Sequence, residues 1–109
     1  MIVLTLLLAC AGTEDSASAT SCPTEAPPTW NTFGHGFVTT YCLACHSEGN
    51  SNRRYGAPEG MDFDTEAQVR LYAERLRVRV IEEETMPVGG GVYADDLLGF
   101  ERYLDCISP

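Results

Sequence analysis

The sequence predicts an all-α domain built from three main helices and the loops that join them. Three stretches of the chain repeat apolar residues at spacings of three and four, the period of a helix with one buried face. No run of alternating or β-branched residues marks a sheet. With 109 residues the chain has room for one domain of this kind.

The N-terminal residues do not share this pattern. Residues 2–8 form an apolar run that is too short to span a bilayer but has the length of the apolar centre of a secretory signal. The run leads into Cys10 through Leu-Leu-Ala, which resembles the lipobox of bacterial lipoproteins, where cleavage before the cysteine accompanies attachment of lipid to its sulfur. We therefore expect a signal peptide at 1–9 and lipidation at Cys10.

One feature keeps alternatives to this assignment open. No lysine or arginine precedes the apolar run, whereas signal peptides usually carry positive charge there. The true start could therefore lie upstream of Met1, and a plain signal peptide cleaved elsewhere is the alternative to lipidation.

Residues 11–28 consist mainly of Ser, Thr, Ala, Glu and Pro and are expected to be disordered. Residues 10–28 are thus predicted to be a lipidated tether, and 29–109 the folded domain.

The first helix is predicted to run from Trp30 into Cys42, with one apolar face formed by Trp30, Phe33, Gly34, Phe37 and Tyr41. It leads directly into Cys42-Leu-Ala-Cys45-His46, the C-x-x-C-H pattern that attaches haem covalently. Each thiol can add to one vinyl group of the porphyrin, while the adjacent imidazole reaches the iron. Cys42, Cys45 and His46 are therefore the predicted haem c residues, with His46 as the proximal iron ligand.

The same five residues have two other interpretations. A dithiol redox pair belongs to a strand, turn and helix of an α/β unit, and no sheet is predicted here. A structural zinc site needs four nitrogen or sulfur ligands, and the remaining His35, Cys22 and Cys106 form no second C-x-x-C or H-x-x-x-H pattern. Haem attachment is the interpretation that the pattern favours.

A second helix is predicted to begin near Asp64 or Thr65, with Asp64 as its N-cap. On its outer side Arg70 can pair with Glu66 and Glu74 at a spacing of four residues. Its apolar stripe consists of Val69, Tyr72, Ala73, Leu76 and Val80. Two loops that contain glycine and proline flank this helix, one before it at 48–62 and one after it at 86–93. Such loops suit a crevice built on a helical frame.

The last helix is predicted to begin at Asp95 or Asp96, with an apolar stripe of Leu97, Phe100, Leu104 and Ile107. Cys106 lies in its last turn, and Cys22 precedes the first helix. A disulfide between these two cysteines would tie both ends of the domain together in an oxidising compartment. Two unpaired thiols are the alternative.

The charge of the chain excludes one class of partner. Sixteen acidic residues against seven basic ones give a formal net charge of −9, so the surface repels nucleic acid and anionic lipid head groups. If the acidic surface has a role beyond solvation, it would steer encounter with a basic partner protein.

An aromatic helix that leads into C-x-x-C-H, a middle helix, a Met-Pro dipeptide and a closing helix together resemble the class I cytochrome c family over residues 30–109. The run from Trp30 to His46, with Tyr-Leu-Asp-Cys near the end, is similar to small lipoprotein cytochromes c of Gram-negative bacteria. The resemblance implies a small cytochrome c-like fold around one haem c. It also implies that the first and last helices cross, with Gly34 and Phe37 facing Phe100 or Tyr103.

The resemblance implies further ligands. Met86 lies in a Thr-Met-Pro loop forty residues after His46, where the family has its axial methionine; Met61 is the competing thioether and His35 the competing imidazole. Pro58 stands where a proline carbonyl of the family holds the Nδ1–H of the proximal histidine, although a turn proline without this role is the alternative. Arginines at 53 and 54 could pair with a haem propionate or be simple loop charges.

With both axial positions filled by protein, the expected function is single-electron transfer, and no enzyme activity is predicted. The protein is expected in the periplasm of a Gram-negative bacterium, anchored to a membrane by its lipid, as a monomer or a subunit of a redox complex. Its expected partners are redox proteins. One alternative is a five-coordinate haem sensor for small gases or peroxide, in which Met86 is not bound. Another is a lipoprotein without haem, in which Cys42 and Cys45 form a disulfide or bind zinc.

Overall fold

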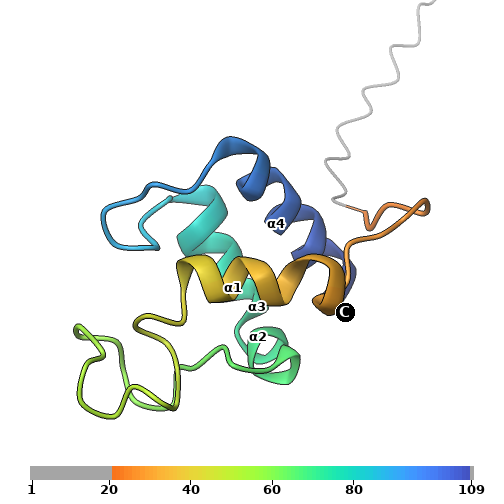
Figure 1. Cartoon of the computed structure of the whole chain (residues 1–109). Helices are drawn as coiled ribbons and strands as arrows, with labels where there is room; N and C mark the ends of the chain where they lie inside the picture. The colour runs from red at the N-terminus through yellow and green to blue at the C-terminus, as the bar shows by residue number, and fades with distance from the viewer. Residues whose placement is uncertain (1–20, 109) are drawn as a thin grey trace, which may run out of the picture.

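The computed structural model describes residues 21–108, in which every regular element is a helix (Figure 1). In chain order the elements are η1 (Trp30–Gly34), α1 (His35–Tyr41), α2 (Glu66–Leu71), α3 (Ala73–Leu76), η2 (Arg77–Glu82) and α4 (Ala94–Ile107), where η denotes a π-helical segment. The prediction of an all-α fold is confirmed for this part of the chain. None of these helices is long and apolar enough to cross a membrane.

The first predicted helix forms η1 and α1, which follow each other without a break. Its start is fixed by Thr29, whose hydroxyl accepts a hydrogen bond from the Thr32 amide (3.1 Å) while the Thr32 hydroxyl accepts one from the Thr29 amide (2.9 Å). This reciprocal pair satisfies amides that the first turn leaves without a partner. The helix ends where the Cys42 amide donates to the Val38 carbonyl (2.8 Å), so it delivers the chain directly to the C-x-x-C-H turn.

The second predicted helix begins at Glu66 with Thr65 as its N-cap, so the prediction of Asp64 as N-cap is wrong. Thr65 and Gln68 form the capping box, in which the Thr65 amide donates to the Gln68 side chain (2.9 Å) and the Gln68 amide to the Thr65 hydroxyl (3.3 Å). Asp64 turns to the preceding loop, where its carboxylate accepts hydrogen bonds from the Ser47 hydroxyl (2.6 Å) and the Glu48 amide (2.9 Å). It therefore stabilises the loop that follows His46.

The middle helical region is broken where the sequence predicted one continuous helix. At Tyr72 the backbone leaves helical angles (φ −108°, ψ 15°), which separates α2 from α3. The apolar stripe still continues across the break into the core through Val69, Ala73, Leu76 and Val80. On the outer side Arg70 pairs with Glu66 (3.3 Å) as predicted, but the predicted pair with Glu74 is not formed. The other terminal nitrogen of Arg70 donates to the carbonyl of Ile107 at the end of α4 (2.9 Å).

The first and last helices cross at a glycine. A Cβ atom placed on Gly34 would lie 2.6 Å from the ring of Tyr103 on α4, so only the bare backbone fits at this point. One turn later Phe37 stacks on Phe100 with ring centroids 3.9 Å apart and an interplanar angle of 4°. Both rings are buried, and Phe100 and Tyr103 are fully so. The aromatic side chains of the two helices thus form the centre of the core.

We expect opposite effects of alanine at two helical glycines of this region. At Gly34 the new methyl group overlaps the Tyr103 ring, so Gly34→Ala should destabilise the fold by about 1 to 3 kcal/mol. At Gly36 a Cβ atom meets nothing within 4 Å, so Gly36→Ala should stabilise it by about 0.5 to 1 kcal/mol through helix propensity. Denaturant unfolding of both variants measures the difference, and equal stabilities would contradict the close approach at Gly34.

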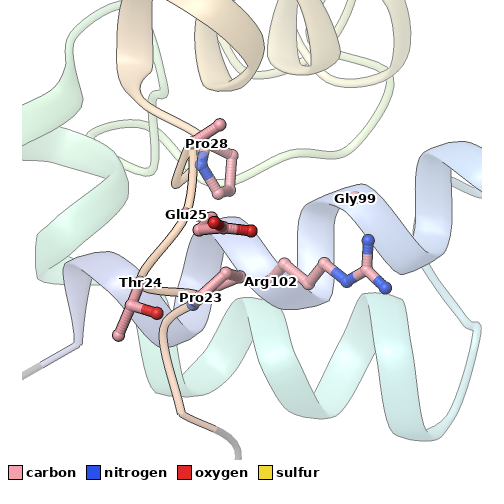
Figure 2. Close-up of a pocket in the computed structure, with 7 residues that line it drawn as sticks. Pro23, Thr24, Glu25, Pro28, Gly99 and Arg102 are labelled. Carbon is pink, nitrogen blue, oxygen red and sulfur yellow. The ribbon is translucent and has the colours of Figure 1, made fainter.

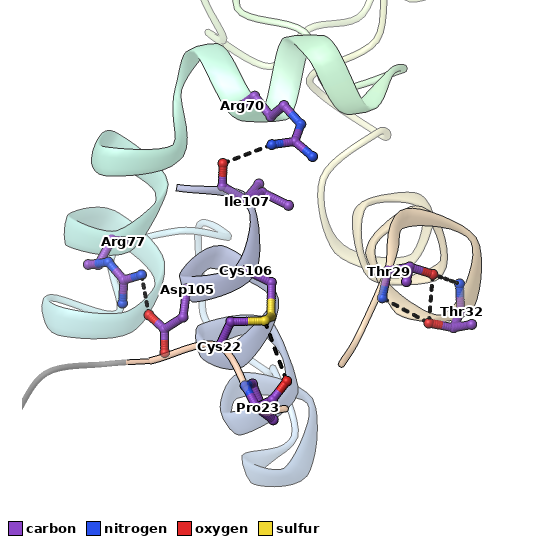
Figure 3. The surroundings of a disulfide bond; sticks show 9 residues. All are labelled: Cys22, Pro23, Thr29, Thr32, Arg70, Arg77, Asp105, Cys106 and Ile107. Atoms are coloured by element: carbon purple, nitrogen blue, oxygen red, sulfur yellow. Dashed lines mark hydrogen bonds and ion pairs between the residues drawn. A yellow bond between two sulfur atoms is a disulfide. The ribbon is translucent and has the colours of Figure 1, made fainter. Parts of the chain in front are cut away.

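The N-terminal end of the described chain lies against α4. Cys22 and Cys106 are joined by a disulfide across a sequence separation of 84 residues (Figure 3). From the loop-closure entropy that it removes from the unfolded chain, this cross-link should stabilise the fold by about 4 to 5 kcal/mol. Residues between Pro23 and Pro28 then follow α4, where they border a hollow with Gly99 and Arg102 (Figure 2). The disulfide thus attaches residues 21–28, the last part of the predicted tether, to this helix.

Two irregular loops lie on the same side of the helices, the left side in Figure 1. The lower loop follows the C-x-x-C-H turn and covers residues 47–62, and the upper one joins η2 to α4 over residues 83–93. Their backbone includes positive φ angles at Tyr55 (52°) and Glu84 (51°), which lie in the left-handed region. The space between the two loops forms the candidate site.

Candidate functional site

A cleft of about 550 Å³ opens between the two loops, a volume within the usual range of cofactor and small-molecule sites. Its walls come from the end of α1, from α3 and η2, and from both loops. The core side chains Phe37, Phe63, Leu76 and Val80 form part of its lining, so much of the wall is apolar. All the residues assigned to haem from the sequence line it: Cys42, Cys45, His46, Pro58 and Met86.

The C-x-x-C-H segment forms a tight turn at the end of α1. The amides of Cys45 and His46 donate to the Cys42 carbonyl (3.1 and 2.9 Å), which brings both thiols and the imidazole to one wall. Asn50 closes the turn from outside, because its side-chain amide donates to the carbonyls of the two middle residues of the motif (2.6 and 2.9 Å). The positions of the two thiols are therefore set by the backbone.

Both motif cysteines are free thiols in the structure. Cys42 is buried and Cys45 is half-buried. Burial, with a smaller contribution from the neighbouring Cys45, raises the pKa of the Cys42 thiol to about 12. A redox-active dithiol needs the opposite, a pKa lowered toward neutral pH. Among residues 21–108, no three His, Cys, Asp or Glu side chains converge in a way that could hold a metal ion by themselves.

His46 is oriented by the backbone of the lower loop. Its Nδ1 lies 2.7 Å from the carbonyl oxygen of Met61. Since a carbonyl can only accept, Nδ1 carries the proton, and in the neutral imidazole Nε2 keeps a free lone pair. The Phe63 amide donates to the His46 carbonyl (2.9 Å), and the Phe63 ring lies 4.9 Å from the imidazole between centroids. The ring of His46 is thus fixed in the tautomer that a metal ligand needs at Nε2.

The prediction that Pro58 supplies the carbonyl for His46 is wrong. The Pro58 carbonyl accepts hydrogen bonds from the Arg54 guanidinium (2.7 Å) and from the Met61 amide (3.2 Å). The loop therefore makes one further turn before its backbone reaches the imidazole, and the oxygen that arrives there is that of Met61.

Met86 follows η2 and is half-buried in the wall of the cleft. The amides of Thr85 and Met86 both donate to the Arg79 carbonyl (2.8 and 3.0 Å), which fastens this loop to the helix end. Met61 also lines the cleft, but its carbonyl bonds to the imidazole, so this residue lies beside His46. His35 is exposed, with its ring 5.3 Å from that of Trp30, and is not part of the cleft.

The two adjacent arginines of the lower loop differ completely. Arg53 is exposed, whereas Arg54 lines the cleft and bonds to four backbone carbonyls of its own loop. Arg54 also forms an ion pair of 2.7 Å with Asp62. Asp62 and Asn50 escaped the sequence reasoning, because a single acidic or amide residue in a polar loop gives no signal of its burial.

The residues in the cleft fit a covalently attached haem. Two free thiols, an imidazole with a free Nε2 and a methionine share one apolar-lined cleft of suitable volume. Lipidation at Cys10 and the signal peptide at 1–9 lie outside the described residues. Compared with known proteins, the chain matches no family model, no curated protein and no solved structure.

Proposed function

We propose that the protein is a monohaem c-type cytochrome with a small cytochrome c-like fold, which transfers single electrons in the bacterial cell envelope. The observation that carries the proposal is the cleft itself, because its lining includes both the C-x-x-C-H turn and Met86, although forty residues separate His46 from Met86. The apolar lining supports it, since a buried porphyrin needs such surroundings and would add apolar surface to a small core.

Each residue of the cleft has a defined task in this proposal. Cys42 and Cys45 hold the haem through thioether bonds, and His46 donates Nε2 to the iron while the Met61 carbonyl keeps its proton on Nδ1. Met86 supplies a soft, weakly donating thioether that favours reduced iron. The bound haem would supply the Fe(III)/Fe(II) couple. If His46 and Met86 both ligate the iron, no position would remain open for a substrate, so we propose electron transfer and no enzymatic reaction.

The position of Met61 supports Met86 as the sixth ligand. A second protein ligand would have to come from a part of the chain other than the one that holds the His46 ring. The Met61 backbone is bonded to the His46 ring, whereas Met86 enters the cleft from the loop fastened to η2. The five-coordinate sensor stays as the alternative function, in which Met86 does not ligate.

The proposed location follows from two kinds of cysteine chemistry that take place outside the cytosol. Covalent haem attachment of this type and the disulfide Cys22–Cys106 both belong to an oxidising compartment. We propose a periplasmic lipoprotein of a Gram-negative bacterium, anchored through Cys10, that acts as a monomer or as a subunit of a redox complex. Its partners would be redox proteins, for which the acidic surface favours a basic docking face.

A haem measurement on the mature protein tests the proposal. We expect protein made together with a cytochrome c maturation system to exceed its polypeptide mass by one haem and to give a pyridine haemochrome spectrum of the c type. A weak near-infrared band of the oxidised form should report sulfur ligation. An unchanged mass in a strain that matures other c-type cytochromes would contradict the proposal.

A further inference from the structure

The lower loop orients the His46 ring although few of its own side chains are buried. Residues 47–62 contain no helix, and most of their side chains are exposed. A loop of this kind is not kept in one conformation by a hydrophobic core. Yet the carbonyl that orients the imidazole, that of Met61, lies at its end. Some other interaction has to fix the path of this loop.

Arg54 connects the distant parts of this loop through hydrogen bonds to its backbone. Its Nε donates to the Ala57 carbonyl (3.2 Å), one terminal nitrogen donates to the Ser47 carbonyl (2.8 Å), and the other donates to the carbonyls of Pro58 (2.7 Å) and Met61 (3.4 Å). The guanidinium thus joins the beginning and the end of the loop. The Met61 carbonyl is shared, because it accepts from both Arg54 and His46.

Asp62 holds the guanidinium in place. Asp62 Oδ1 forms an ion pair of 2.7 Å with the same terminal nitrogen of Arg54 that donates to Pro58 and Met61, and within residues 21–108 it makes no hydrogen bond. The two side chains are 11% and 7% exposed, so both charges are largely shielded from water. Without Arg54, Asp62 would be an unpaired buried charge, which folded proteins rarely tolerate.

We propose that Arg54, fixed by its ion pair with Asp62, is a positioning residue for His46 and acts through the Met61 carbonyl. The pair keeps this carbonyl on the imidazole Nδ1–H, which holds the tautomer with Nε2 unprotonated and makes the imidazole a stronger donor. Arg54 is therefore engaged within the loop, and the haem propionate role considered for it is not required. The part of this inference that concerns iron rests on the proposed function.

A charge-neutral double variant tests the inference. Arg54→Gln/Asp62→Asn removes one positive and one negative charge, and no unpaired buried charge remains. Its matched control, Arg53→Gln/Glu59→Gln, makes the same change at two exposed positions of the same loop. We would measure solvent exchange of the His46 Nδ1–H by NMR in protein with ¹⁵N-labelled histidine, where His35 is the internal reference. The midpoint potential of the holoprotein is the second readout.

The variant should lose protection of the His46 proton, with exchange about three- to tenfold faster, and its midpoint potential should rise because a weaker imidazole donor stabilises Fe(III) less. The control should match the wild type in both measurements. Arg54→Lys, which keeps a charge beside Asp62 but cannot reach four carbonyls, should change both in the same direction by less. This single variant also serves if the double variant does not fold.

Unchanged exchange and potential in the double variant and in Arg54→Lys would overturn the inference, as would equal changes in the control. A protein without haem contradicts the proposed function and leaves the positioning role open to the same NMR measurement. In that case faster exchange in the double variant alone still supports the role of Arg54 and Asp62, and unchanged exchange refutes it.

Discussion

Replacement of Cys42 and Cys45 together by serine should abolish covalently bound haem. The two thiols lie on one wall of the cleft, on a turn whose backbone is fixed from both sides, and a serine hydroxyl is too weak a nucleophile to form the corresponding bond. Purified variant protein should show the mass of the bare polypeptide and no haemochrome spectrum. Either single replacement should lower the yield of holoprotein, because one thioether remains available.

The two other cysteines of the described chain provide the matched control. Cys22→Ser/Cys106→Ser removes the same number of cysteine sulfurs, but from a disulfide that joins the two ends of the described chain and does not line the cleft. This variant should retain its haem and lose about 2 to 5 kcal/mol of stability. Covalent haem in the Cys42→Ser/Cys45→Ser variant, or its loss only when the disulfide is removed, would contradict the assignment of the motif.

The helices were predictable because their information is local. Spacings of three and four place Phe37 of α1 and Phe100, Leu104 and Ile107 of α4 in the core without knowledge of what they pack against, although the fully buried Val38 and Tyr103 lie off the predicted stripes. The break at Tyr72 was not predictable, since the apolar stripe passes through it unchanged. The close approach of Gly99 to the Phe33 ring, where an added Cβ atom would lie 2.6 Å from the ring, was also missed, because a glycine inside a helix pattern does not reveal its neighbour.

The candidate site also has a part that could be predicted from the sequence and a part that could not. The C-x-x-C-H turn is short enough for its geometry to follow from sequence, and all predicted haem residues line one cleft. The partner of His46 depends instead on the path of an irregular loop, where counting residues led to Pro58 and the hydrogen bonds lead to Met61. We attribute that path to the buried pair Arg54 and Asp62. Their contacts lie within an irregular loop, so they produce no periodic pattern in the sequence.

Met86→Ala should open a coordination position on the iron. If Met86 is the sixth ligand, its removal takes away a donor that favours Fe(II), so the midpoint potential should fall and carbon monoxide should bind the reduced protein. The near-infrared band of the oxidised form should disappear. The loop that carries residue 86 should persist, because the hydrogen bonds from residues 85 and 86 to the Arg79 carbonyl use backbone amides that alanine retains.

Met61→Ala is the control for this prediction, since it removes the other thioether of the same cleft. The Met61 carbonyl that holds His46 belongs to the backbone and is unaffected by the substitution, so the variant should keep the potential, the band and the closed coordination of the wild type. An open site in Met61→Ala with a native spectrum in Met86→Ala would reverse the assignment. Carbon monoxide binding by the wild type itself would instead favour the five-coordinate sensor, because a ligating Met86 keeps that position closed.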